Sequence, residues 1–129
     1  MIGKAIYSLL DADATLTAKL GSKIFPDFIP QGTNFPALIY RIVNTDPAYT
    51  KSGAATLDEI DIQLEIYHTS YTEAQTIAAA CRTALDFYTG TVAGLTIQSI
   101  SFQDQQSQVF EAEQELVVLA QGYKVRHTR

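Results

Sequence analysis

An unbroken alternation of polar and apolar side chains between residues 59 and 66 restricts the fold of this chain more than any other feature. The apolar set is Ile60, Ile62, Leu64 and Ile66, and the polar set is Glu59, Asp61, Gln63 and Glu65. Successive side chains of a β-strand point to opposite faces, so this pattern predicts a strand with one buried and one wet face. Because a slip of one residue would bury every carboxylate, we expect a sheet that is covered on one face only.

Two segments have the helical periodicity needed to cover the buried face of such a sheet. The first lies between about Ile2 and Leu20, and its apolar face is formed by Ile2, Ile6, Leu9 and Leu10. Within this segment, Asp13 is expected to cap a short second helix, and Gly21 is expected to end it. The pattern therefore predicts helical structure over most of the first twenty residues.

The second helical segment begins at Ser70-Tyr-Thr-Glu73, which has the sequence of a capping box. In that motif the Ser70 hydroxyl accepts a hydrogen bond from the Glu73 amide, while the Glu73 side chain reaches back to the Ser70 amide. The apolar stripe that follows is Ala74, Ile77, Ala78, Cys81, Leu85 and Tyr88. Gly90 is expected to end this helix.

Three further strands are predicted at residues 37–43, 95–104 and 115–126. The last of them turns four side chains toward the core, namely Val117, Leu119, Tyr123 and Val125. A change of parity near residues 98–99 predicts a β-bulge. The proline-rich window from Pro26 to Pro36 is expected to be extended and turning. Two polar segments, 44–56 and 103–114, are predicted to be long loops, which are usually functional or mobile.

The resulting order of elements is helix, two strands, helix, two strands. Strands that follow each other directly favour antiparallel pairing, and amphipathic helices favour packing on one face of the sheet. The predicted fold is therefore α+β: a two-layer sandwich in which two helices cover one face of an antiparallel four-stranded sheet. A chain of 129 residues, 47% of them hydrophobic, is large enough for one domain over residues 1–129 with its own core.

The charge of the chain is acidic overall and unevenly distributed. Nine Lys and Arg residues against fourteen Asp and Glu residues give a net charge of −5, which argues against broad binding to phosphate. Residues 57–115 contain ten acids and one base, whereas residues 124–129 are locally basic. The fold can bring these parts together, or it can leave an acidic and a basic face that suit assembly into rings or stacks.

The residues that carry catalytic or metal chemistry form no site in the sequence. Cys81 lies on the apolar stripe, where a buried thiol is expected, and His68 and His127 have no supporting cluster of ligands. Asp61 and Glu65 are about 13 Å apart along a strand, too far for paired-carboxylate catalysis. We therefore expect no enzyme activity, no metal and no cofactor.

The remaining composition excludes two further classes of protein. A single cysteine excludes a disulfide scaffold. No apolar run approaches the ~20 residues that span a bilayer, and no apolar signal-peptide core follows Lys4. We therefore expect a protein that is made in a cytoplasm and has no membrane partner.

Six short segments, distributed along almost the whole chain, carry a family resemblance. They are IYSLLDADA (6–14), GSKIFP (21–26), PQGTNFPALIY (30–40), IDIQLEIY (60–67), SYTEA (70–74) and RTALD (82–86). In their order and spacing they resemble the tail-completion, or tail-terminator, family of long-tailed bacteriophages and related gene transfer agents. The family has no catalytic motif that could be carried over to this chain.

This resemblance implies a structural protein of the virion tail that is made in the bacterial cytoplasm. It implies a homo-oligomeric, hexameric ring that caps the tail tube protein and later meets the head connector or stopper protein. DNA would pass nearby without specific binding. Two other classes stay open at this level: a small phage-encoded protein-binding module or regulator, and a small hydrolase or other enzyme.

Four residues are candidates for contacts between subunits of such a ring. We expect Lys124 and Arg126 to face outward and to meet an acidic surface of the next subunit or of a tail partner. Tyr49 and Phe110 are further interface candidates, and they lie in the two predicted loops. We expect these loops to become ordered only on assembly, because their composition offers little apolar surface to offset the entropy of ordering. The alternative is a solvated basic tail and plain surface loops.

The acidic row of the central strand is a candidate for the channel of the ring. Glu59, Asp61 and Glu65 are expected to face away from the helices, and part of this row is expected to line or border the lumen. An acidic wall would repel phosphate and keep the duplex from sticking. The alternative is a plain outer surface or a strand contact between subunits.

Overall fold

The computed structural model describes residues 2–21, 23–32, 34–50, 53–111 and 115–128, and for residues 44–50, 53–57, 107–111, 115 and 128 it describes the backbone alone. Its helices are α1 (Ile2–Asp11), α2 (Ala14–Leu20) and α3 (Tyr71–Leu85). Its strands are β1 (Ile24–Pro26), β2 (Ala37–Thr50), β3 (Gly53–His68), β4 (Gly90–Val92), β5 (Leu95–Glu111) and β6 (Glu115–Thr128).

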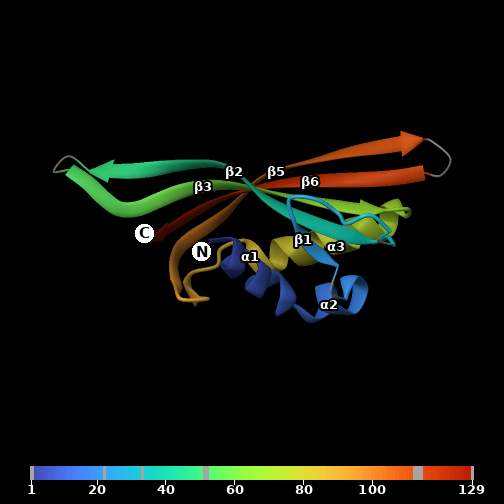
Figure 1. The fold of residues 1–129 in the computed structure, drawn as a ribbon, viewed down its shortest axis with the longest axis horizontal. Helices are drawn as coiled ribbons and strands as arrows, with labels where there is room; N and C mark the ends of the chain where they lie inside the picture. Colours follow the sequence, from blue (N-terminus) through green and yellow to red (C-terminus); the bar gives the residue numbers. More distant parts are fainter. Residues whose placement is uncertain (1, 22, 33, 51–52, 112–114, 129) are drawn as a thin grey trace.

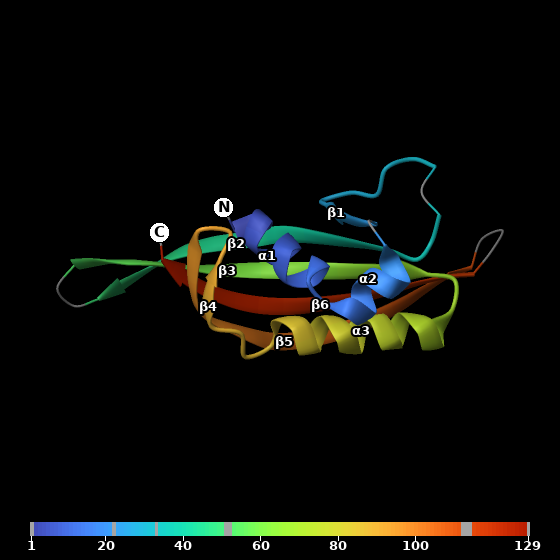
Figure 2. The ribbon, with the colours of Figure 1, turned by 90° about the horizontal axis from the view of Figure 1, so that it is seen from below.

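The strands form one sheet in the order β1-β2-β3-β6-β5-β4. β1 runs parallel to β2 and the other neighbours are antiparallel. The helices lie together on one face of this sheet (Figure 2). The predicted antiparallel four-stranded sheet with two helices is therefore wrong, because the described residues form a mixed six-stranded sheet with three helices. β1 and β4 have three residues each, too few for a periodic pattern to reveal them.

The two segments predicted to be long loops are strands wherever their backbone is described. β2 pairs with β3 as far as Thr50 opposite Gly53, and β5 pairs with β6 as far as Glu111 opposite Glu115. Figure 1 shows the two hairpins extending in opposite directions beyond the layer of helices. The prediction failed because strand pairing is made by backbone groups, whereas the polar composition of these segments reports only that neither face is buried.

The predicted core is confirmed, and it lies between α3 and the central strands. The predicted core side chains of β3 and β6 are all buried, namely Ile60, Ile62, Leu64, Ile66, Val117, Leu119, Tyr123 and Val125. Those of α3 are Ala74, Ile77, Ala78, Cys81 and Leu85, and those of α1 include Ile2, Ile6 and Leu10. The predicted bulge is confirmed by a register shift between Ile97 and Ser99. The alternation therefore predicts correctly which face of the sheet the helices cover.

The caps of the helices agree with the sequence in part. Asp13 caps α2, since its carboxylate accepts a hydrogen bond from the Leu16 amide at 3.0 Å. Ser70 caps α3 in the same way by accepting from the Glu73 amide at 3.4 Å. The returning half of the predicted capping box is wrong, because the Glu73 carboxylate binds Lys19 Nζ of α2 at 2.9 Å instead. This ion pair ties the start of α3 to the neighbouring helix.

The end of α3 also differs from the prediction. The helix ends at Leu85 with Asp86 as its C-cap, so Gly90 does not end it and Tyr88 lies beyond it. Phe87 follows with a φ angle of +66°, a left-handed conformation that turns the chain toward β4. The apolar spacing extended to Tyr88 and hid this turn, because spacing alone does not reveal where the backbone leaves the helix.

A buried polar contact joins α3 to β6 within this apolar layer. Gln121 is only 1% exposed, and its side-chain nitrogen donates to the Ala78 carbonyl oxygen at 3.0 Å and to Gln105 Oε1 at 2.9 Å. Its oxygen accepts a hydrogen bond from the Tyr123 hydroxyl at 2.9 Å. Because buried polar groups are costly when they lose their partners, this contact fixes how α3 sits on the sheet.

We predict that Gln121→Met lowers the free energy of unfolding by about 1–3 kcal/mol, because it leaves the buried Tyr123 hydroxyl without its acceptor. Adding Tyr123→Phe should cost less in the Gln121→Met background than in the wild-type protein, since the stranded hydroxyl is then removed. Urea unfolding measures both effects. Gln106→Met, the same change at an exposed position, is the control, and additive losses in the double mutant would contradict the network.

Candidate functional site

The face of the sheet opposite the helices carries the charged side chains that alternate with the core on β3 and β6. The register places Glu59 opposite Arg126 and Asp61 opposite Lys124. Lys124 Nζ lies 3.1 Å from Glu59 Oε1 and 3.8 Å from Asp61 Oδ1. Arg126 Nη2 lies 3.5 Å from Glu59 Oε2. The acidic and basic segments of the sequence are thus brought together on one face.

Glu65, the third carboxylate of the row, is held by a separate set of contacts. Its side chain is 12% exposed, and Arg41 Nη2 of β2 lies 3.2 Å from Glu65 Oε2. The Tyr67 hydroxyl donates to Glu65 Oε1 at 2.9 Å, and Gln63 Nε2 donates to Oε2 at 3.4 Å. Burial and the hydrogen bond to this carboxylate raise the pKa of Tyr67 to about 12. Tyr67 therefore stays a neutral donor at physiological pH.

Each carboxylate of the predicted acidic row consequently has a base within 4 Å in the same chain. The three acids are Glu59, Asp61 and Glu65, and the three bases are Arg41, Lys124 and Arg126. The two bases of β6 face outward as expected, with side chains 40% and 55% exposed. The acidic surface that they meet is that of their own β3. Contacts of this face with another subunit or with a channel stay predictions.

The other two interface candidates cannot be placed as side chains. Those of Tyr49 and Phe110 lie outside the described part of the structure. Their backbones belong to β2 and β5 near the hairpin ends, where Tyr49 is opposite Ala54 and Phe110 is opposite Leu116. Their role at an interface, and the ordering of these segments on assembly, stay predictions.

Several large apolar side chains that the sequence did not single out are exposed. Among the described residues they are Phe28, Ile42, Val43, Tyr71 and Phe87. Phe87 is the most exposed of them, at 86%. Ile42 and Val43 belong to a continuous apolar run, and such a run does not reveal which side is buried. Phe87 lies within the segment that the apolar stripe predicted to be helical, and the stripe gave no sign that this side chain would be exposed.

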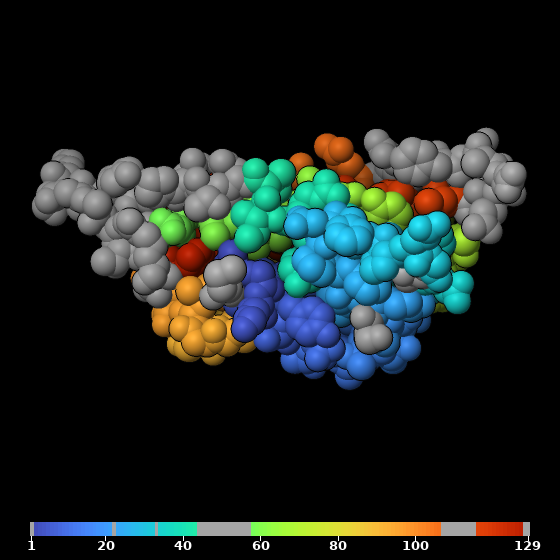
Figure 3. Space-filling model, viewed as in Figure 1, coloured from blue at the N-terminus to red at the C-terminus, as the bar shows by residue number. Residues whose placement is uncertain are grey.

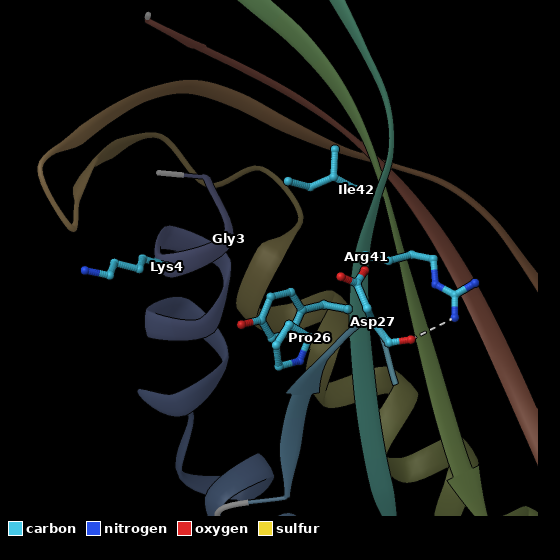
Figure 4. A pocket seen from close by; sticks show the side chains of 7 residues that line it. Gly3, Lys4, Pro26, Asp27, Arg41 and Ile42 are labelled. Carbon is cyan, nitrogen blue, oxygen red and sulfur yellow. Dashed lines mark hydrogen bonds between the residues drawn. The ribbon is translucent and has the colours of Figure 1, made fainter. Parts of the chain in front are cut away.

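An open pocket of about 330 Å³ lies at the β1–β2 edge of the sheet, beside the first turn of α1. It is lined by Gly3, Lys4, Pro26, Asp27, Tyr40, Arg41 and Ile42. Figure 4 shows the charged ends of Lys4 and Arg41 pointing away from the pocket on opposite sides, with Arg41 donating to the Asp27 carbonyl oxygen at 3.2 Å. The pocket therefore has apolar walls and a polar rim.

The pocket opens on a surface that the proline-rich segment shapes. In Figure 3 this segment, in cyan, covers the middle of the visible face next to α1. Asp27 has a φ angle of +64°, and its amide donates to the Tyr40 carbonyl oxygen at 3.0 Å, so the chain turns away from the sheet directly after β1. The remainder of β2, from Arg41 onward, is left as the outer edge of the sheet among the described residues.

Cys81 and His68, whose side chains could carry catalytic or metal chemistry, are held by burial and by a backbone hydrogen bond. Cys81 is fully buried, and burial raises the pKa of its thiol. His68 Nδ1 accepts a hydrogen bond from the Ser70 amide, and burial lowers the pKa of this imidazole. Within the described residues, no three His, Cys, Asp or Glu side chains are grouped to hold a metal ion. No described helix is long and apolar enough to cross a membrane.

Comparison with known proteins agrees with this arrangement of helices and sheet. The family model described as "Tail completion protein gp17" matches residues 4–128. A chain in the solved structure "Virion of native gene transfer agent (GTA) particle" superposes with a TM-score of 0.75 at 21% identity, covering 97% of this chain and 92% of that chain. A second solved structure, whose name states no function, gives a TM-score of 0.50 at 17% identity over 95% of this chain and 94% of that chain. No curated protein sequence matches the chain.

We predict that Lys124→Glu lowers the free energy of unfolding by at most about 1 kcal/mol, because it places like charges beside Glu59 and Asp61 on an exposed face. The loss should shrink in high salt, where exposed charges are screened. Adding Asp61→Lys should restore most of the stability, since opposite charges then face each other again. Urea unfolding at low and high salt measures this, and an equal loss at both salt concentrations would contradict it.

Proposed function

This chain belongs to the tail completion protein gp17 family, and we propose that copies of it close a ring at the end of a phage tail tube. The protein is a structural component of the virion tail. The ring, a hexamer in this proposal, caps the tube and later joins it to the head connector. The observation that carries the proposal is the family match over residues 4–128.

The arrangement of the sheet supports ring formation. One face is covered by helices and the other carries paired charges, so the surfaces left for lateral contact are the two edges. These edges differ, because β1 and β2 form one and β5 and β4 form the other. A contact between unlike edges is heterologous, and repetition of a heterologous contact closes a ring when the rotation permits.

The two hairpins support contacts with partners above and below the ring. An isolated two-stranded hairpin is marginally stable in water, so strand ends that extend beyond the helices gain stability from a neighbour. In the proposal, the ends of β2–β3 and β5–β6, which carry Tyr49 and Phe110, bind the tail tube protein, the head connector or the next subunit. Their ordering would then be completed on assembly.

The outer sheet face fits the channel side of the ring. DNA passing through a channel must not adhere to its wall. Glu59, Asp61 and Glu65 are neutralised by bases of the same face, so in this proposal the wall neither attracts nor strongly repels phosphate. This arrangement replaces the expected acidic wall by a balanced one.

The proposed function is tested by removing the protein from particles and adding it back. Tails made without it should be of abnormal length or should fail to join heads, and purified protein should restore joining in vitro. Native mass spectrometry of the protein and electron microscopy of repaired tails should then detect a ring at the head-proximal end. Normal joined particles without the protein, or its absence from mature virions, would contradict the proposal.

A second prediction concerns the channel face. Neutralising two acids with Glu59→Gln and Asp61→Asn leaves Lys124 and Arg126 without these counter-charges, so DNA ejection should slow, most strongly at low salt. The matched control is Lys124→Gln with Arg126→Gln, which removes the same number of charges of opposite sign and should not slow ejection. Unchanged ejection from particles shown to contain the first variant would place this face away from the DNA.

A further inference from the structure

Phe87 occupies an unfavourable backbone conformation and gains no burial from it. Its φ angle is +66° and its side chain is 86% exposed. The turn is nevertheless well fixed, because the Phe87 amide donates to the Ile100 carbonyl oxygen at 2.9 Å and Asp86 Oδ1 accepts from the Phe102 amide at 3.1 Å. A bulky residue at positive φ is uncommon; such residues occur at helix C-termini and cluster at functional sites. The phenyl side chain is thus held outward at the β5 edge of the sheet.

The apolar pocket lies at the opposite edge of the sheet, and its nearest row, that of Ile42, is two residue pairs from the row of Ile100. The register connects one row across the four central strands: Ile42, Ile62, Tyr123 and Phe102. Ile42 lines the pocket, and Phe102 is two residues from Ile100, on which Phe87 is hydrogen-bonded. Both features also belong to the helix side, since α1 borders the pocket and α3 leads into Phe87. A lateral shift across the sheet, combined with a slide of about two residue pairs along the strands, would therefore bring one onto the other.

We propose that Phe87 of one copy of this chain inserts into the pocket formed by Pro26, Tyr40 and Ile42 of the next copy. The inference rests on the ring proposed above and names its lateral contact. A cavity of about 150 Å³ holds a benzene ring, so the pocket of about 330 Å³ has room for a phenyl group. The contact joins unlike edges, so each copy offers one Phe87 and one pocket and the contact can repeat until the ring closes.

The rims of the two partners have complementary chemistry. Arg82 lies near Phe87 on the last turn of α3, with its side chain 56% exposed. Asp27 lies at the rim of the pocket, and the charged ends of the two bases in the lining, Lys4 and Arg41, point away from it (Figure 4). An insertion of Phe87 brings these opposite charges to the same interface, and an aromatic anchor in an apolar pocket with a polar rim is the usual composition of an interaction hot spot.

The first test compares matched substitutions in the full-length protein. Phe87→Ser and Ile42→Ser should each reduce ring formation and repair of tails by about tenfold or more, as expected for loss of a hot-spot side chain. Phe28→Ser and Val43→Ser remove exposed apolar side chains outside the pocket and should leave both readouts unchanged. Normal rings formed by Phe87→Ser would overturn the inference and leave the proposed function intact.

A second measurement separates assembly from folding. Phe87→Gly relieves the left-handed strain and removes little buried surface, so the isolated subunit should melt at a higher temperature while its rings are weakened. Circular dichroism and native mass spectrometry measure the two effects. A variant that is both stabilised and fully able to form rings would contradict the inference.

Crosslinking tests the identity of the partner. With Thr83→Cys beside Phe87 and Lys4→Cys at the pocket rim in one chain, Phe87 and Ile42 are kept, and oxidation of assembled tails should give a ladder of covalently joined copies of this chain. The native Cys81 is fully buried with a raised thiol pKa, so it should not react. The control pair is Thr83→Cys with Phe28→Cys, which should give no ladder. A crosslink to a tail tube or connector protein instead, or no crosslink in joined particles, would overturn the proposed contact.

Discussion

The structure depends on the antiparallel pairing of β3 with β6, which has an apolar face on one side and a charged face on the other. Residues 57–68 pair without interruption with residues 117–128 in the middle of the sheet. The apolar side of this pair requires a cover, which α1, α2 and α3 supply. The charged side must remain at a surface, and the register that buries Leu64 and Tyr123 also sets Glu59 and Asp61 of β3 beside Lys124 and Arg126 of β6.

This pairing separates what the sequence predicts from what it does not. The alternation from Glu59 to Ile66 and the stripe of α3 predict the layers and the core, because each is a local pattern with a single physical reading. The short strands β1 and β4 have no such pattern, and their pairing partners are set by the tertiary fold. The hairpin ends were missed for a related reason, since a backbone ladder can form where no side chain is buried.

The candidate site was predictable only as a list of residues on faces. The sequence places Glu59 and Lys124 on strands and indicates their outward direction, but their contact requires the register between segments about sixty residues apart. The pocket and the exposure of Phe87 could not be predicted in this way. The pocket forms where α1, β1 and β2 meet, and Phe87 is exposed because of its left-handed backbone conformation. Sites made by such meetings leave little local signal, whereas a buried stripe leaves a strong one.

The same division explains where the subunit of the proposed ring can place features that destabilise a single copy. The faces of the sheet are fully used within one chain, by helices on one side and ion pairs on the other. In the proposed ring, the edges and the hairpin ends are left for contacts between copies, so features that are unfavourable in a single copy should gather there. The left-handed Phe87 and the exposed Ile42 both lie at edges: Ile42 begins the row that ends at Phe102, and Phe87 is hydrogen-bonded to Ile100, two residues from Phe102. Their cost to the free subunit is small, because neither disturbs the β3–β6 pair, and burial against a neighbour would offset it only when the subunit assembles.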